Sequence, residues 1–268
     1  MSSSEDWIEQ FRQAVERYYE KPHDPFMEWF SQRRSENAFA GHVHELATIL
    51  TDARFDQAGI PAEKALENTI SVYELLSADL VSVSQVPLLT APPNSEMGNE
   101  SWTRAFVTAF PAIRATAIEI VKTHDWAAPG LQERIDAIPW MGVKTSRLAV
   151  RWIHELVPDA VEVDMSDSRV PVDRNLYRVA SRLRIVDPSR DVYSGEGSLG
   201  DARIQQFARL AFPRYPVRID EPMWKMARRS QDGGHCHPKN PRCDGCFFES
   251  FCPKMHRSSD PSATGIRL

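Results

Sequence analysis

Apolar residues return every three or four positions along most of the chain, and this pattern predicts an almost wholly helical protein. The first such face comprises Trp7, Ile8, Phe11, Ala14, Val15 and Tyr18, preceded by candidate N-caps at Ser2 to Ser4. The same spacing predicts helices over residues 42–51, 62–76, 103–123, 131–138, 145–156, 174–183 and 199–212. Strand-like alternation is nearly absent, and Pro, Gly, Asp and Asn separate the helices, so we expect an all-α fold.

The composition fits a globular protein of one large or two smaller domains, since 42% of the 268 residues are hydrophobic. No run of eighteen apolar residues occurs, and the N-terminus lacks the basic and apolar regions of a signal peptide. We therefore expect no membrane contact and no secretion. The expected location is the cytoplasm, with nucleoid association in a bacterium or archaeon.

Charge is distributed unevenly along the sequence. The formal net charge of -5 combines about -12 up to residue 167 with about +7 from residue 168 onward. A basic half of this kind suits contact with phosphates on one side of a protein. Scattered surface charge is the alternative interpretation.

All four cysteines fall in one short segment, as Cys236-x6-Cys243-x2-Cys246-x5-Cys252. Residues so close together cannot cross-link distant parts of a fold, so ligation is favoured over disulfides. Structural zinc normally uses two separated pairs, whereas a single uneven loop suits a [4Fe–4S] cluster. Zinc and incidental free thiols remain as alternatives, and the flanking His235 and His237 are interpreted as exposed loop residues.

Residues 138–146 read Ile-Pro-Trp-Met-Gly-Val-Lys-Thr-Ser between two predicted helices, which indicates a helix-hairpin-helix. A short hairpin with glycine lets the backbone approach a phosphate, and the amides that open the second helix point toward the anion. Such contacts position DNA without reading its sequence. Many DNA-handling proteins use this motif without base chemistry.

The cysteine spacing, the hairpin and residues 171–179 together resemble the endonuclease III family of helix-hairpin-helix, iron–sulfur DNA glycosylases. The resemblance covers about 115 residues, from the hairpin to the last cysteine. It implies a six-helix barrel domain over residues 43–158, ending in the hairpin. Residues 1–42 and 159–268 would form a helical domain whose cysteines hold a [4Fe–4S] cluster. The implied partner of this monomer is double-stranded DNA that contains a damaged or modified base.

The resemblance also implies a catalytic pair. Lys144 matches the family's nucleophilic lysine, which displaces the base and forms a Schiff base with the deoxyribose; a phosphate-contacting surface lysine is the alternative. Asp173 matches the family's catalytic aspartate, which stabilises positive charge on the sugar, and a plain helix cap is its alternative. The expected DNA-binding residues are Trp140, Gly142, Val143, Thr145, Arg174 and Arg178.

Two departures from the family's sequence pattern leave the identity of the excised base undetermined. Trp140 stands where the family has glycine, and we expect its side chain in the core, with a DNA-wedging role as the alternative. Ala53 lies near the place of the glutamine that relatives insert into DNA.

The acidic loop over residues 158–171 is interpreted as a solvated surface loop rather than a substrate-selecting insertion.

The expected activity is therefore that of a DNA N-glycosylase and abasic-site lyase, acting on damaged, chiefly oxidised, pyrimidines. A second possibility is a glycosylase without lyase activity or with another specificity, such as mismatched thymine or uracil, a methylated base or an oxidised purine. Further alternatives are a non-catalytic or redox-sensing iron–sulfur protein that binds DNA, and a structural zinc module.

Overall fold

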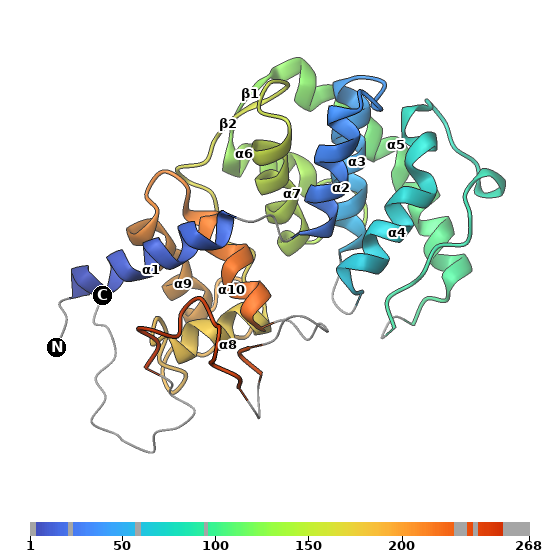
Figure 1. Cartoon of the computed structure of the whole chain (residues 1–268). Coiled ribbons are helices and arrows are strands. Elements are labelled where there is room, and N and C mark those ends of the chain that lie inside the picture. The colour runs from blue at the N-terminus through green and yellow to red at the C-terminus, as the bar shows by residue number, and fades with distance from the viewer. Residues whose placement is uncertain are drawn as a thin grey trace. The chain divides into compact units, whose positions relative to one another are not determined.

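The computed structural model describes residues 4–20, 24–56, 60–93, 96–227, 235–237 and 241–253. Helices dominate this part of the chain, which contains ten α-helices and two three-residue strands (Figure 1). The expected all-α class is thereby confirmed. Ser2 and Ser3, which the sequence analysis names as candidate N-caps, lie outside the described residues.

The chain divides into two compact units. The middle unit spans residues 22–164, and the terminal unit combines residues 1–21 with 165–268. Within the middle unit lie α2 (Pro25–Ser35), α3 (His42–Phe55), α4 (Ala62–Val72), η1 (Tyr73–Ser77), η2 (Val83–Gln85), α5 (Asn99–Thr123), β1 (Asp125–Ala127), α6 (Ala128–Asp136), α7 (Val143–Leu156) and β2 (Glu162–Asp164). The terminal unit contains α1 (Ser4–Tyr19), α8 (Arg174–Arg182), α9 (Leu199–Ala211), η3 (Pro216–Ile219) and α10 (Asp220–Ala227).

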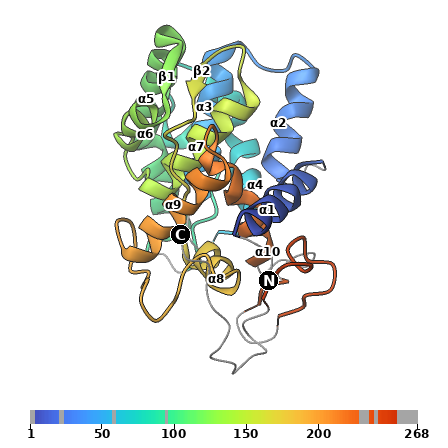
Figure 2. The same cartoon turned by 90° about the vertical axis from the view of Figure 1, so that its left-hand side faces the viewer.

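Helix α3 lies at the centre of the middle unit. It packs against α4, α5 and α7, and all of its residues from His44 to Phe55 are buried. Figure 2 shows the same helices from a second side. A helix that is buried around its whole circumference must satisfy its polar side chains inside the protein.

Helix α2 belongs to the middle unit, although the sequence analysis assigned residues 1–42 to the other domain. Asp24 caps its N-terminus by accepting hydrogen bonds from the amides of Phe26 and Met27. The Phe26 ring packs 4.7 Å from the ring of Trp152 in α7. Arg34 then donates to Glu45 of α3 at 2.7 Å, so side chains at both ends of α2 join it to this unit.

The acidic connection after α7 is ordered structure rather than a solvated loop. Its residues Glu162–Asp164 form strand β2, which pairs in parallel with β1. Val163 and Met165 are buried while Glu162 and Asp164 are exposed. Successive side chains of a strand point to opposite faces. This explains why the acidic side chains of the segment face solvent while its apolar side chains contribute to the core.

The terminal unit joins the two ends of the described chain. The Phe11 ring of α1 stacks on Phe248 at 5.5 Å, and the Trp7 ring lies 5.5 Å from Phe251. Tyr18 donates a hydrogen bond to Glu221 of α10 at 2.9 Å. Helix α1 thus packs directly on the segment that carries the cysteines.

No helix in the described ranges has both the length and the apolar character that a membrane crossing requires.

His44 gives the middle unit a pH dependence with a definite sign. Its Nδ1 accepts from the Ala40 amide at 3.2 Å, and its Nε2 therefore carries the proton that it donates to the Tyr73 carbonyl at 2.9 Å. Burial lowers the pKa of His44, so the neutral ring contributes stability that is present above about pH 6.5 and is lost as the pH falls. We expect the thermal midpoint to fall between about pH 7.5 and 5 more steeply in the wild type than in His44→Gln. Equal slopes in circular-dichroism melts would contradict this role.

Candidate functional site

The hairpin between α6 and α7 closes through a tight turn. The Ile138 carbonyl accepts a hydrogen bond from the Met141 amide at 3.0 Å, with Pro139 and Trp140 at the two central positions. Trp140 has a φ of 59°, in the left-handed region that glycine adopts most easily. Proline followed by a residue with positive φ is the signature of a type II turn. Trp140 therefore adopts a backbone conformation that glycine accepts most easily.

The Trp140 side chain is not in the core, contrary to the expectation from sequence. Half of its surface (50%) is exposed, and its ring lies 5.7 Å from the Arg54 guanidinium carbon. The backbone direction imposed by the turn explains the difference, because a left-handed residue at a hairpin tip projects its side chain away from the helices that it joins. The hairpin retains its closing hydrogen bond despite the bulky residue.

Thr145 fixes the start of α7. Its Oγ1 accepts from the Gly142 amide at 2.9 Å and donates to the Gly142 carbonyl at 2.8 Å. The first helical hydrogen bond runs from the Ser146 amide to the Gly142 carbonyl at 2.9 Å. The amides of Val143 and Lys144 therefore precede the helical ladder, and they are better placed to meet an anion than the amide of Gly142, which Thr145 already occupies.

Gly142 itself is exposed and has an ordinary φ of -93°. A Cβ added there would meet nothing nearer than Thr145 Oγ1, at 3.9 Å. The folded chain consequently does not require glycine at this position. A side chain here would instead obstruct a partner that approaches the hairpin backbone.

Lys144 lies in the first turn of α7 and is half-buried. Three residues separate it from Trp140, so both residues lie close to the α7 N-terminus along the chain. Asp173 lies in the terminal unit and Lys144 in the middle unit. Their pairing in one site stays a prediction.

Asp173 is the N-cap of α8, as one of its two interpretations stated. Its Oδ1 accepts from the amides of Asn175 at 2.8 Å and Leu176 at 2.9 Å. The side chain is half-buried. A carboxylate that caps a helix has its orientation fixed by the backbone, which is compatible with a second role in chemistry.

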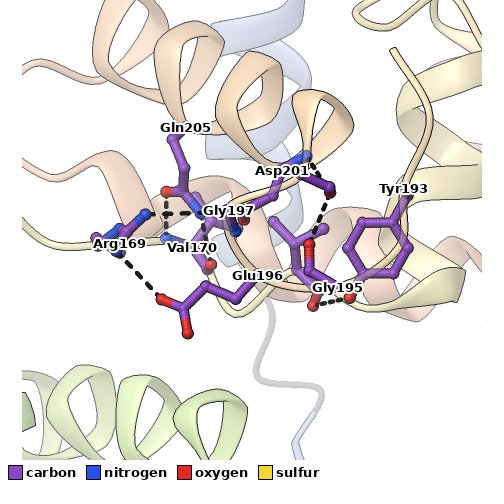
Figure 3. A network of polar contacts seen from close by, with 10 residues as sticks. Arg169, Val170, Tyr193, Gly195, Glu196, Gly197, Asp201 and Gln205 are labelled. Carbon is purple, nitrogen blue, oxygen red and sulfur yellow. Dashed lines mark hydrogen bonds and ion pairs between the residues drawn. The ribbon is translucent and has the colours of Figure 1, made fainter.

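A polar network holds the segment that leads to Asp173 (Figure 3). Gln205 of α9 accepts from the Val170 amide and donates to the Val170 carbonyl, both at 2.9 Å. It also donates to the buried Asp201 at 3.0 Å, whose other oxygen accepts from the Gly197 amide. Arg169 closes the network through Glu196 at 3.2 Å. Residues 169–172 are thus secured on α9 before the chain reaches the capping aspartate.

The two arginines expected to bind DNA differ in their surroundings. Arg174 is exposed at the start of α8. Arg178 donates to the carbonyls of Cys236 at 3.0 Å and Ala227 at 2.8 Å. Its guanidinium therefore joins α8 to α10 and to the first cysteine, and a phosphate contact by Arg178 would compete with these bonds.

The four cysteines lie in the terminal unit, each half-buried and none in a disulfide. The Cys246 amide donates to the Cys243 carbonyl at 2.9 Å, and Gly245 supplies the positive φ (79°) that this turn needs. Arg182 of α8 donates to Cys236 Sγ at 3.1 Å.

The thiols lie near enough to influence one another. Burial raises the pKa of Cys246 to about 12, and charge on Cys236, Cys252 and Cys243 would raise it further. Within the described residues, however, no three His, Cys, Asp or Glu side chains already form a group that could hold a metal ion. The donor set of four closely spaced thiols fits a cluster, and ligation would require these side chains to turn toward a common centre.

Sequence reasoning missed a group of residues behind the hairpin: Thr51, Arg54 and Trp102. The sequence signal that could have found them is a polar and charged set of residues, which includes Thr51 and Arg54, within the helix-forming segment of α3.

The turn at Trp140 predicts an unusual preference for glycine over alanine. A left-handed conformation costs an ordinary residue about 1 kcal/mol, so Trp140→Gly should be more stable than Trp140→Ala by about that amount in urea unfolding. The matched control is the exposed helical residue Glu133 of α6, where the alanine variant should be the more stable one. Equal stability of the two Trp140 variants would show that the left-handed backbone is not maintained.

No protein-family model matches this chain, and the curated proteins contain no significant match to it.

Proposed function

We propose that the protein is a DNA glycosylase with abasic-site lyase activity, and that Lys144 is its nucleophile. The observation that carries the proposal is the hairpin. A type II turn, an exposed glycine that the fold does not itself require and a half-buried lysine all lie at the N-terminus of α7.

The hairpin is suited to hold a DNA phosphate. The amides of Val143 and Lys144 and the positive end of the α7 dipole favour an anion at this point. Gly142 leaves room for the approach, because it has no side chain between the hairpin backbone and solvent. A phosphate bound here places the adjoining sugar near the first turn of α7, where Lys144 is located.

The chemistry assigned to Lys144 is nucleophilic. Its neutral Nζ attacks C1′ of the deoxyribose, and the N-glycosidic bond breaks with its electron pair leaving on the base, which takes up a proton. The nitrogen then loses a proton and the C1′–O4′ bond opens to give the Schiff base, after which removal of a C2′ proton expels the 3′ phosphate by β-elimination. A lysine with an ordinary pKa is neutral in only about one molecule in 2,500 at pH 7, so desolvation by the bound nucleotide would assist. Asp173 would stabilise the positive charge that develops on the sugar.

The cysteine segment is proposed to bind a [4Fe–4S] cluster through Cys236, Cys243, Cys246 and Cys252. Such a cluster would cross-link the terminal segment that packs on α1 and α8. Its role in this proposal is structural.

Borohydride reduction of the protein on a duplex with one abasic site tests the lysine chemistry. We expect a covalent adduct with the wild type and its loss in Lys144→Gln, because only a primary amine forms a reducible Schiff base. Lys122→Gln is the matched control, since Lys122 is an exposed lysine in the last turn of α5 of the same unit. Trapping that survives in Lys144→Gln would refute the assignment.

The variant Asp173→Asn distinguishes the helix-capping role of Asp173 from its proposed role in catalysis. Asparagine caps helices about as well as aspartate, so the thermal midpoint should change little. Loss of the carboxylate should reduce strand cleavage about 100-fold or more if it acts on the developing charge. Asp173→Ala, which removes the cap as well, should lower both stability and activity. Unchanged strand cleavage by Asp173→Asn would show that Asp173 acts as a helix cap and has no role in catalysis.

Iron and sulfide analysis tests the cofactor. We expect about four of each per chain and a broad visible absorbance, both lost in Cys246→Ser. His235→Asn should retain them, because the Nδ1 of this histidine lies 3.0 Å from the Arg242 carbonyl and the residue is not an expected ligand. Stoichiometric zinc in a colourless protein would contradict the cluster.

A further inference from the structure

Three buried residues on α3 and α5 carry hydrogen-bond donors that have no acceptor in the described part of the chain. All three guanidinium nitrogens of Arg54 are unpaired, as are Thr51 Oγ1 and Trp102 Nε1. Arg54 and Thr51 are completely buried, with 0% exposure, and Trp102 is 3% exposed. The three residues adjoin one another, since Thr51 precedes Arg54 by one helical turn and the Arg54 guanidinium carbon lies 5.1 Å from the Trp102 ring centroid.

Aromatic rings lie around this donor cluster of Thr51, Arg54 and Trp102, and Arg54 forms no ion pair within the described residues. The guanidinium carbon of Arg54 lies 5.7 Å from the Trp140 ring and 5.9 Å from the Phe55 ring. The neighbouring Asp52 accepts a hydrogen bond from Thr69 at 2.6 Å. Burial lowers the pKa of Arg54 to about 10.

Such an arrangement is unfavourable for folding. Contacts with ring faces offset part of the lost hydration of a guanidinium, but its N–H groups still lack acceptors. An apolar side chain of similar length would be better tolerated in the same surroundings. The donors are therefore explained most simply by a bound group that supplies several acceptors.

Trp140 is both a neighbour of Arg54 and partly exposed to solvent. Of the three rings placed near the Arg54 guanidinium in the described part of the chain, those of Trp102 and Phe55 are buried, and that of Trp140 is half exposed. A shift of the Trp140 ring would therefore remove one of the side chains that cover the guanidinium. Trp140 lies four positions before Lys144, which is in the first turn of α7.

We propose that Thr51, Arg54 and Trp102 form the recognition site for the target base, that this base presents carbonyl acceptors, and that the Trp140 ring shifts to admit it. The inference rests on the proposed glycosylase function and extends it to substrate class. A base taken out of the duplex must be read by groups inside the protein. A guanidinium fork, an indole N–H and a hydroxyl match the keto edges of guanine, thymine, uracil and their oxidised derivatives. The amino groups of adenine and cytosine would oppose these donors.

Arg54→Met tests recognition separately from lysine chemistry. Binding would be measured by fluorescence anisotropy on duplexes that carry, at one position, uracil, thymine glycol, 8-oxoguanine, adenine, cytosine or a tetrahydrofuran abasic analogue. We expect the wild type to bind at least one keto base about 10- to 100-fold more tightly than the abasic analogue. Arg54→Met should bind that duplex no better than the analogue, with its affinity for the analogue unchanged.

The melting temperature distinguishes a ligand-binding arginine from a purely structural one, because replacing a structural arginine would lower it. We expect Arg54→Met to melt about 2 °C or more above the wild type, since it removes an uncompensated buried charge. The control is Arg104→Met, at an exposed arginine of α5, which should alter neither the melting temperature nor the keto preference.

Several outcomes would overturn the inference. These are a wild-type preference for an amino base, no preference for any keto base over the abasic analogue, and an Arg54→Met variant that keeps the keto preference or that loses affinity for the abasic analogue as well. Borohydride trapping on the abasic duplex is independent of the base. Trapping without keto recognition would refute this inference alone, whereas absence of trapping would refute the proposed lysine chemistry.

Discussion

The burial of α3 on every side is the constraint from which the organisation of the middle unit follows. A helix in this position needs partners around its whole circumference, and α4, α5 and α7 pack against it. Its polar side chains must then be satisfied internally. His44 and Asp52 meet this requirement through Tyr73 and Thr69, whereas Arg54 does not. Arg54 is therefore the buried side chain of α3 for which we propose a ligand.

In the terminal unit, two helices organise the segments that carry the expected chemistry. Helix α9 holds Val170 through Gln205, three residues before Asp173 caps the start of α8. Helix α8 then contacts the first cysteine through Arg178 and Arg182. Helix α8 thus connects Asp173 at its N-terminus with the first cysteine, Cys236. Loss of the proposed cluster would for this reason be expected to disturb Asp173 as well.

The helices with one apolar face were predictable from sequence, because their spacing repeats with the helical period; α1, α7 and α9 are examples. Helix α2 was missed although Asp24 and Pro25 carry an evident start signal. The hairpin was found through its residues, but the exposure of Trp140 depends on a positive φ that side-chain patterns do not encode. Arg54 was missed because sequence shows neither burial nor the absence of a partner. Asp173 was recognised with both of its interpretations, and the structure shows the cap.

The central claim is that one lysine of the hairpin reacts with the deoxyribose. Tandem mass spectrometry of the borohydride-reduced adduct, formed on an abasic duplex and digested to peptides, identifies the modified residue directly. The account predicts the reduced sugar remnant on Lys144. A remnant on another amine, such as Lys225 or the N-terminus, or the absence of any adduct would contradict it.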